Sequence, residues 1–507
     1  MEKETKTDIS RRDFVQSSLA LGAGAMIPSM LTKASFAAAN PATPKTDNLV
    51  GIQIGAISFI DEGVNQVLDN IQKSGQINTL FLATFTYDGG IAGRQIKGYP
   101  FPDHGKLEYQ DLRGGNYATP HPQFYKNTIL KETKAPDHGD WDMLAAVIPE
   151  AKKRGLKTYV FNQDSFTWHK DVPNIAKLQE IGIYGQHVES CCDLNPDYIN
   201  FISGMTKDIC SSYDIDGLMW SSERQGPFNN AIAPFKGERP SARITCFCEH
   251  HRKAAKLAGI DVNRTLEGYH KLVDFSRKST AGQRPVDGYF AEFWRIMTDY
   301  PEILAYEKLW TAGNHATYAN VYNSAKAAKP SIQAGFHIWH SNSLSPFTKA
   351  EMPYERLAYA DFIKPVIYNI VGGSRYAGYI NSNASTVFGD LSKEEYLKVN
   401  NRLMNYEDMD LTTLGKEGMP QDYVAKETKR ALDSVQGKCK IYAGLDIDIP
   451  NAAKNKQTTP EDAYRSTMTA LKAGAQGIIF ARKYSEMKLP NIAGGAKAVK
   501  DFYEGKG

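Results

Sequence analysis

The chain has 507 residues, 23% of them charged, and a formal net charge of only +3, so it lacks the strong basic field typical of nucleic-acid-binding proteins. Six cysteines in a chain of this length exclude a small disulfide scaffold. The length alone would suit two or three average domains, but single barrels reach it too, so repetition along the chain decides the domain count.

The N-terminal segment predicts an export signal. Paired arginines and a phenylalanine in "SRRDFVQ" (10–16) precede a weakly apolar run and the small-residue stretch "ASFAAAN" (34–40). This order is typical of a twin-arginine signal peptide, which we expect over residues 1–39, the alternative being a frayed basic helix. No later segment reaches the ~20 uninterrupted apolar residues that a transmembrane helix needs. The mature protein is therefore expected in the periplasm or outside the cell, without a membrane span.

From residue 48 onward, short aliphatic runs alternate with longer amphipathic segments. Asn195 followed by Pro196, and Thr459 followed by Pro460, are helix start signals in two of these segments. Strands that alternate with helices predict an α/β fold with a parallel sheet, and eight of them predict a (β/α)8 TIM barrel over residues 40–507 as a single domain. An open doubly wound sheet is the alternative, but no G-x-G-x-x-G follows the first run. The runs are 49–59, 77–85, 156–163, 215–222, 331–339, 361–369, 439–448 and 475–483.

Two connections, 86–140 and 224–330, are far longer than an ordinary loop between a strand and a helix. The first is rich in aromatic residues, and the second contains a cluster of cysteines and a helical tract. Insertions of this length either build a substrate site or cover apolar surface, and we expect the former.

Three carboxylates that follow or end strand-like runs are the candidate catalytic groups. Glu223 follows the fourth run, and active sites of such barrels lie at the C-terminal ends of the strands. Trp220 could raise its pKa to that of a general acid, whereas Arg224 could pair with it and lower the pKa. Asp446 and Asp448 lie two positions apart and are expected on one side of the seventh strand, as nucleophile or water-activating base. A surface ion pair and loop carboxylates are the alternatives.

Polar and aromatic residues at the other strand ends complete the predicted site. Sugar hydroxyls need polar partners and sugar C–H faces stack on rings, so this mixture suits a carbohydrate. Two carboxylates that flank a glycosidic bond are sufficient to hydrolyse it. The predicted substrate contacts are Asp164, Trp220, Arg224, His337, Trp339, His340, Tyr368, Asn369, Lys483, Tyr484 and His121.

The stretch "CFCEHH" (246–251) gathers soft ligands, as a zinc or copper site would. It lacks a second well-spaced ligand pair. We therefore expect a buried helix start or a disulfide at Cys246 and Cys248, and no metal or other cofactor in the protein.

The stretches "CFCEHHRKAAKLAGIDVNR", "HIWHSNSLSPF", "ADFIKPVIYN" and "ARKYSEM" together resemble a group of exported, hypothetical bacterial TIM-barrel proteins related to glycoside hydrolases. The resemblance covers most of the mature chain and brings no assigned substrate. Members of that group tend to carry a cysteine where this chain has His251.

A looser resemblance is to the retaining barrel clan that includes β-galactosidases, whose acid/base follows strand four and whose nucleophile follows strand seven. It implies Glu223 as acid/base and Asp446 or Asp448 as nucleophile. Ser222 replaces the clan's usual asparagine, and an aspartate replaces its usual glutamate nucleophile. We predict an exported glycoside hydrolase that cleaves a polysaccharide or oligosaccharide. A metal-dependent barrel lyase or isomerase and a non-catalytic carbohydrate-binding barrel are the alternatives.

Overall fold

A computed structural model describes residues 48–86, 102–107, 112–164, 172–232, 243–449, 452 and 454–507. The predicted signal peptide, residues 1–39, lies outside this part of the chain, as do 87–101 of the first long connection. None of the described helices is both long and apolar enough to cross a membrane.

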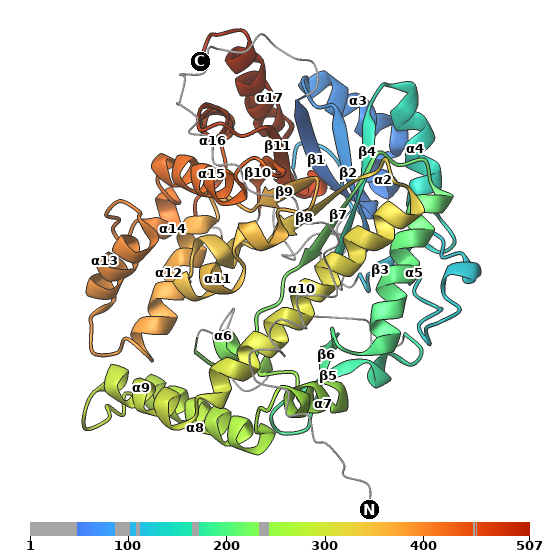
Figure 1. Cartoon of the computed structure of the whole chain (residues 1–507). Coiled ribbons are helices and arrows are strands. Elements are labelled where there is room, and N and C mark those ends of the chain that lie inside the picture. The colour runs from blue at the N-terminus through green and yellow to red at the C-terminus, as the bar shows by residue number, and fades with distance from the viewer. Residues whose placement is uncertain are drawn as a thin grey trace, which may run out of the picture. The chain divides into compact units, whose positions relative to one another are not determined.

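Eight parallel strands form a closed barrel, because β1 pairs with β11 on one side and with β2 on the other. The predicted (β/α)8 barrel is therefore confirmed, and each of the eight aliphatic runs overlaps one of its strands, which extends at most one residue beyond the run (Figure 1). In barrel order the strands are β1 (Leu49–Gly55), β2 (Thr79–Thr86), β4 (Lys157–Asp164), β7 (Gly217–Ser222), β8 (Gln333–Ile338), β9 (Phe362–Pro365), β10 (Lys440–Asp448) and β11 (Gly477–Arg482).

Helices surround the barrel, and the start signals in the sequence act as expected. The Asn195 side chain accepts from the backbone N–H of Asp197, and Thr459 forms a capping box with Asp462. The helices other than those of the second insertion are α2 (Ala56–Glu62), α3 (Val64–Ser74), α4 (Met143–Lys153), α5 (Pro196–Ser212), α11 (Pro346–Glu351), α12 (Gly372–Ala384), α13 (Lys393–Met404), α14 (Leu414–Glu417), α15 (Gln421–Val435), α16 (Pro460–Lys472) and α17 (Leu489–Tyr503).

Large aromatic side chains fill the barrel interior opposite glycines. A Cβ on Gly217 would lie 2.4 Å from the Tyr159 ring, and one on Gly335 would lie 2.5 Å from the Phe362 ring. Glycine is thus required where these rings cross the barrel, which holds a packed core and not a pore. The buried residues of this inner cluster are Leu49, Phe81, Ala83, Tyr159, Phe161, Met219, Phe362, Tyr442 and Ile479.

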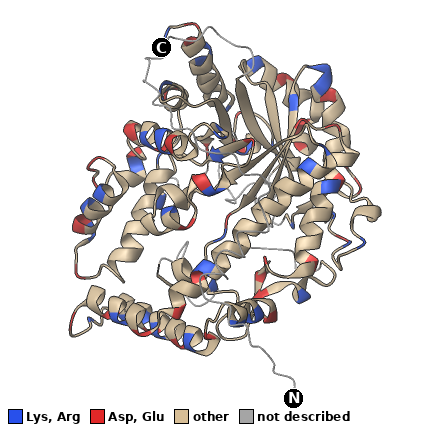
Figure 2. Ribbon diagram, viewed as in Figure 1, with Lys and Arg blue, Asp and Glu red and all other residues tan. Residues whose placement is uncertain are grey.

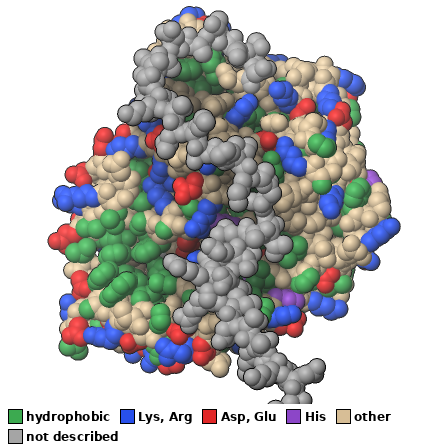
Figure 3. All heavy atoms as spheres, in the orientation of Figure 1, with side chains coloured by type: hydrophobic (Ala, Val, Ile, Leu, Met, Phe, Trp, Pro, Cys, Tyr) green, Lys and Arg blue, Asp and Glu red, His purple; other side chains and the backbone are tan. Residues whose placement is uncertain are grey.

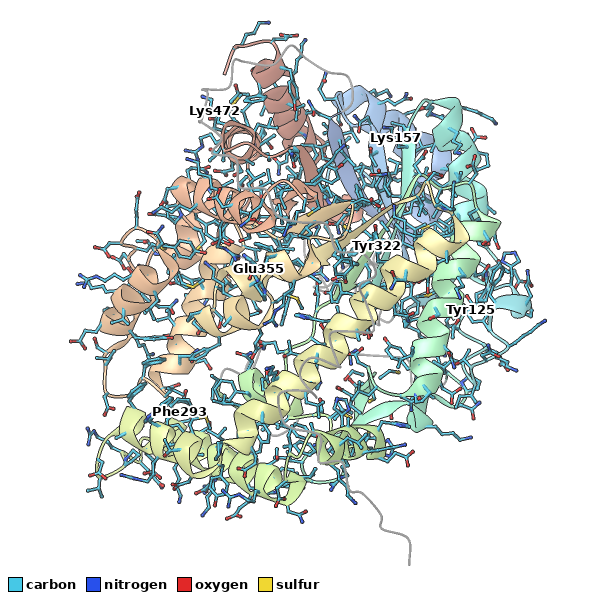
Figure 4. All side chains as sticks on the ribbon, in the orientation of Figure 1. Tyr125, Lys157, Phe293, Tyr322, Glu355 and Lys472 are labelled. Atoms are coloured by element: carbon cyan, nitrogen blue, oxygen red, sulfur yellow. The ribbon has the colours of Figure 1, made fainter. Side chains whose placement is uncertain are left out.

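The second predicted insertion is a helical layer with its own apolar core, built around Phe228, Tyr269, Phe293 and Tyr306. In Figure 4, Lys157 at the start of β4 lies near the top and Phe293 lies at the bottom. The layer therefore lies beyond the C-terminal ends of the strands, as expected for an insertion that builds a site. Its helices are α6 (Pro227–Ile232), α7 (Glu249–Leu257), α8 (Val262–Thr280), α9 (Tyr289–Asp299) and α10 (Glu302–Ala328).

A further long connection, between β4 and α5, was not anticipated from the sequence. It carries a small antiparallel sheet of β5 (Gln179–Ile181) and β6 (His187–Cys191), whereas β3 (Gly115–Asn116) pairs with the end of β2. Short 3-10 helices include η6 (His340–Ser343) and η8 (Tyr484–Glu486). On the outer helices, acidic and basic side chains are interspersed (Figures 2 and 3), in keeping with the low net charge.

Candidate active site

A buried lysine stands above the aromatic layer, near the C-terminal ends of the strands. Lys364 lies two residues beyond Phe362 on β9 and is completely buried. Its Nζ donates to Gln53 Oε1, lies 3.4 Å from the Tyr368 hydroxyl and lies 3.2 Å from His337 Nδ1. Burial lowers the pKa of Lys364 to about 7, Glu223 opposes this shift, and Arg482 adds to it. Sequence reasoning missed Lys364 because it lies inside a strand and not at the strand's end.

The space for Lys364 depends on Gly444 of β10. A Cβ at this position would lie 2.4 Å from Lys364 Cε and 2.9 Å from the Pro365 carbonyl oxygen. We expect Gly444→Ala to lower the free energy of unfolding by roughly 1–3 kcal/mol through overpacking, measured by chemical denaturation. Gly378→Ala is the control, because nothing lies within 4 Å of a Cβ there and alanine favours its helix. Equal stability of the two variants would contradict the close contact.

Glu223 is held in its ionised form. It directly follows β7, its side chain is 17% exposed, and its Oε1 lies 3.3 Å from His337 Nε2. Burial opposes ionisation, but contact with His337 and the charges of Arg482 and Arg375 prevail and lower the pKa of Glu223 to about 2. At neutral pH this side chain is a carboxylate.

The His337 ring connects this carboxylate to the buried lysine. A lysine ammonium can only donate, so Nδ1 accepts from Lys364 and the ring hydrogen lies on Nε2, facing Glu223. Burial and the Lys364 charge lower the pKa of His337 to about 4. The ring is therefore neutral at pH 7, and it stacks on Phe161 with 5.4 Å between ring centroids.

Asp446 is held in a contrasting environment. It is 1% exposed, and its Oδ2 accepts from the Val371 backbone N–H at 2.7 Å. Burial raises the pKa of Asp446 to about 7, against the backbone N–H groups of Val371 and Ile370 and the charge of Arg375. The second oxygen, Oδ1, has no hydrogen-bond partner among the described residues. Asp446 is thus a carboxyl group that keeps its proton to near neutral pH.

The charge of Arg375 on α12 acts on both carboxyl groups. It lowers the pKa of both Glu223 and Asp446, and Arg375 Nη1 lies 3.1 Å from His340 Nδ1. The charges of Glu223 and Asp446 also both act on Tyr368. Sequence reasoning missed Arg375, because it lies inside a helix and no pattern links it to the strand ends. Of the predicted contacts, His337, His340 and Tyr368 belong to this group, and Trp339 directly precedes His340.

Asp448 does not share the side of Asp446, contrary to the sequence-based expectation. The pairing of β10 with β11 shifts register between the two aspartates, so the simple alternation of a strand fails there. Asp448 Oδ2 instead accepts from Asn491 Nδ2 at 2.9 Å and from the Lys488 backbone N–H at 3.2 Å, around the start of α17. Burial raises its pKa to about 7 as well. Its partners give Asp448 a structural role at that helix.

Arg224 and Trp220 lie behind β7 and not beside Glu223. Arg224 Nη2 binds Asp164 Oδ2 and Asp193 Oδ1, each at 2.8 Å, instead of pairing with Glu223. Trp220 is fully buried in the main core around the barrel, whereas its neighbour Met219 belongs to the inner cluster. Alternation along the strand turns the indole outward, so the shielding expected of Trp220 comes from other groups.

The remaining predicted contacts face surrounding helices or loops. Asn369 accepts from Ser466 of α16, and Tyr484 accepts from Asn70 of α3. Lys483 is fully buried, with its Nζ 3.9 Å from Glu486. His121 contacts Asp208 of α5 at 2.8 Å. These contacts give the four residues structural partners outside the group around Glu223.

No protein-family model matches this chain, and no curated protein matches it. Its fold is similar to solved structures. The β-galactosidase from the Antarctic haloarchaeon Halorubrum lacusprofundi matches with a TM-score of 0.50 and 11% identity, over 90% of this chain and 58% of that one. The structural neighbours are TIM-barrel glycoside hydrolases.

Two more of these neighbours show the range of coverage. The PgaB (BpsB) glycoside hydrolase domain from Bordetella bronchiseptica has a TM-score of 0.48 and 11% identity, over 90% of this chain and 98% of that one. A GH42 β-galactosidase from G. stearothermophilus has a TM-score of 0.47 and 12% identity, over 91% and 58%. The chain thus spans little more than half the length of the β-galactosidases. At such identity the similarity concerns the fold alone.

Proposed function

We propose that this protein is a glycoside hydrolase that cleaves a polysaccharide or oligosaccharide between Glu223 and Asp446. The observation that carries the proposal is that the charge of Arg375 acts on two carboxyl groups whose pKa values are about 2 and about 7. Hydrolysis of a glycosidic bond needs one ionised carboxylate and one protonated carboxyl group.

The pKa values support roles opposite to those expected from the sequence. Glu223, ionised at neutral pH, is suited to be the nucleophile or the base that activates water. Asp446, which keeps its proton to about pH 7, is suited to protonate the leaving oxygen. Its unpartnered Oδ1 is the oxygen available for this proton transfer. Arg375 and Tyr368 interact electrostatically with both carboxyl groups, and His340 contacts Arg375. We propose that these three residues bind sugar hydroxyls.

The position of the soft ligands favours this proposal over a metal-dependent lyase or isomerase. Within the described part of the chain, the group of metal-ligating side chains that could hold an ion consists of Cys192, Cys246, Cys248 and His251. None of these four is among the main causes of the pKa shifts of Glu223 or Asp446. The other alternative, a non-catalytic carbohydrate-binding barrel, is distinguished from a glycoside hydrolase by experiment, because it would bind sugar without hydrolysing it.

We also propose that the enzyme acts outside the cytoplasm, on the support of the twin-arginine pattern in residues 10–39. Expression with the arginine pair intact or replaced by lysines, followed by fractionation, tests this. Export that continues after the replacement would contradict the twin-arginine route.

The experiment that tests the function is hydrolysis of a panel of aryl glycosides and polysaccharides by the purified protein, with the pH dependence of kcat/KM. The active form needs Glu223 ionised and Asp446 protonated, so kcat/KM should fall about tenfold per pH unit above about pH 7. The pKa of Lys364 is also about 7, so this group could cause the same fall. The pH profile of Asp446→Asn is therefore compared with that of the wild type, to assign the fall to Asp446. With activated dinitrophenyl glycosides, which need no proton donor, this variant should keep its rate and lose the alkaline fall.

A further inference from the structure

The chain folds so that soft ligands distant in the sequence meet in one buried cluster. The ligand atoms of Cys192, Cys246, Cys248 and His251 all lie within 4.8 Å of one another. The four residues are between 0% and 9% exposed. Cys192 Sγ lies 3.4 Å from Cys248 Sγ and 3.2 Å from His251 Nδ1, and Cys248 Sγ lies 3.8 Å from His251 Nδ1.

Local structure explains how the ligands meet. The segment before α7 pairs with the end of β5, through a bridge between Gly182 and Thr245 and a hydrogen bond from the Phe247 N–H to the Ile181 carbonyl. This pairing brings Cys246 to the β5–β6 sheet, which Cys192 follows, and Figure 1 shows α7 beside that sheet. Cys248 is the N-cap of α7, and His251 follows one turn later on the same face.

These distances fit tetrahedral zinc better than a disulfide. A disulfide needs sulfurs about 2.05 Å apart. Zinc bound at about 2.3 Å by sulfur and about 2.0 Å by nitrogen separates its ligands by roughly 3.5–3.8 Å. The ring also turns Nδ1 toward the thiols, which leaves Nε2, without a described partner, to carry the hydrogen.

We propose that Cys192, Cys246, Cys248 and His251 bind one zinc ion as a closed structural site. Four protein ligands fill a tetrahedral zinc ion and leave no open position for substrate. The ion ties the connection after β4 to the segment before α7. Among the described residues, neither of these two segments contains a long helix that would fix it.

The site also supports the wall behind Glu223, a step that rests on the proposed function. The residues on either side of Cys192 hold Arg224: the Cys191 carbonyl accepts from Nη1 at 2.5 Å, and Asp193 accepts from Nη2 at 2.8 Å. Arg224 directly follows Glu223 in the chain. Zinc at Cys192 therefore fixes the backbone that carries Glu223, and Cys192 acts as a positioning residue.

The test is the zinc content of the purified full chain, measured by plasma mass spectrometry after dialysis against a weak chelator. We expect one zinc ion per chain in the wild type and in Cys439→Ser, a buried cysteine outside the cluster. Cys246→Ser and His251→Ala should lose at least about tenfold of the bound zinc, because each removes one of four ligands. His251→Cys should retain zinc, because a thiolate can replace the imidazole as a ligand. If the ring served only to fill space, this variant would bind no more zinc than His251→Ala.

The wild type alone can overturn the proposal, even if a cysteine variant fails to fold. Folded wild-type protein with less than about a tenth of a zinc ion per chain, or a Cys192–Cys248 disulfide in non-reducing peptide mapping, would do so. Metal content does not depend on turnover, so an enzyme without glycosidase activity that still holds zinc would refute the proposed function only. If both proposals hold, zinc removal lowers the thermal midpoint and also lowers kcat more than it changes KM.

Discussion

Glu223→Gln is expected to lower kcat/KM for glycoside hydrolysis by about 1,000-fold, which corresponds to roughly 4 kcal/mol of transition-state stabilisation. The amide keeps the size and the contact with His337 but removes the negative charge that attacks or activates water. The fold should persist, because glutamine has nearly the same size and the side chain is partly exposed. The measurement is steady-state kinetics on the best substrate of the panel, with circular dichroism to verify folding.

Glu355→Gln is the matched control. Glu355 is exposed on a short 3-10 helix, and its substitution removes the same charge from the surface of the protein. The kcat/KM of this variant should stay within about twofold of the wild type. Small anions such as azide or formate can replace a missing nucleophile or base, so partial rescue of Glu223→Gln by them would support the assigned role. Undiminished turnover in Glu223→Gln would remove this residue from the chemistry.

Asp446→Asn is expected to lower kcat on substrates with poor leaving groups by about 100-fold or more, because general acid catalysis contributes about 10²–10⁴-fold. The same variant should be more stable than the wild type at alkaline pH. The folded-state pKa of Asp446, about 7, exceeds the unfolded value of about 3.9. The wild type therefore loses stability as pH rises between these values, and the loss is complete above about pH 7.

Asparagine does not ionise, so between about pH 5 and about pH 8 the variant should lose less free energy of unfolding than the wild type, by on the order of 2 kcal/mol. Urea denaturation at the two pH values measures this difference. Asp448→Asn is the matched control, because its pKa is raised to about 7 by burial too, but its partners lie at α17. It should reduce the pH dependence of stability and keep catalysis. Loss of activity in both variants alike would contradict a distinct role for Asp446.

The candidate site was only partly predictable from the sequence. Glu223 and Asp446 were found because they follow or end strands of a recognisable barrel, and His337, His340 and Tyr368 were found for the same reason. Trp220 and Asp448 were misplaced, because the inward face of a strand depends on its register. The shift between Asp446 and Asp448 leaves no trace in the residue pattern. Lys364 and Arg375 were missed because a lysine within a strand and an arginine within a helix carry no local signal.

The sequence by itself determined the eight strands, their order and the starts of helices such as α5 and α16, since periodicity, caps and turns act between residues close along the chain. Only the tertiary structure decided which carboxyl group keeps its proton, because burial and the charge of Arg375 arise from distant segments. It alone also brought Cys192 within 3.4 Å of Cys248, a residue 56 positions away. Such contacts depend on how the barrel closes and how its connections pack, and no local pattern encodes either.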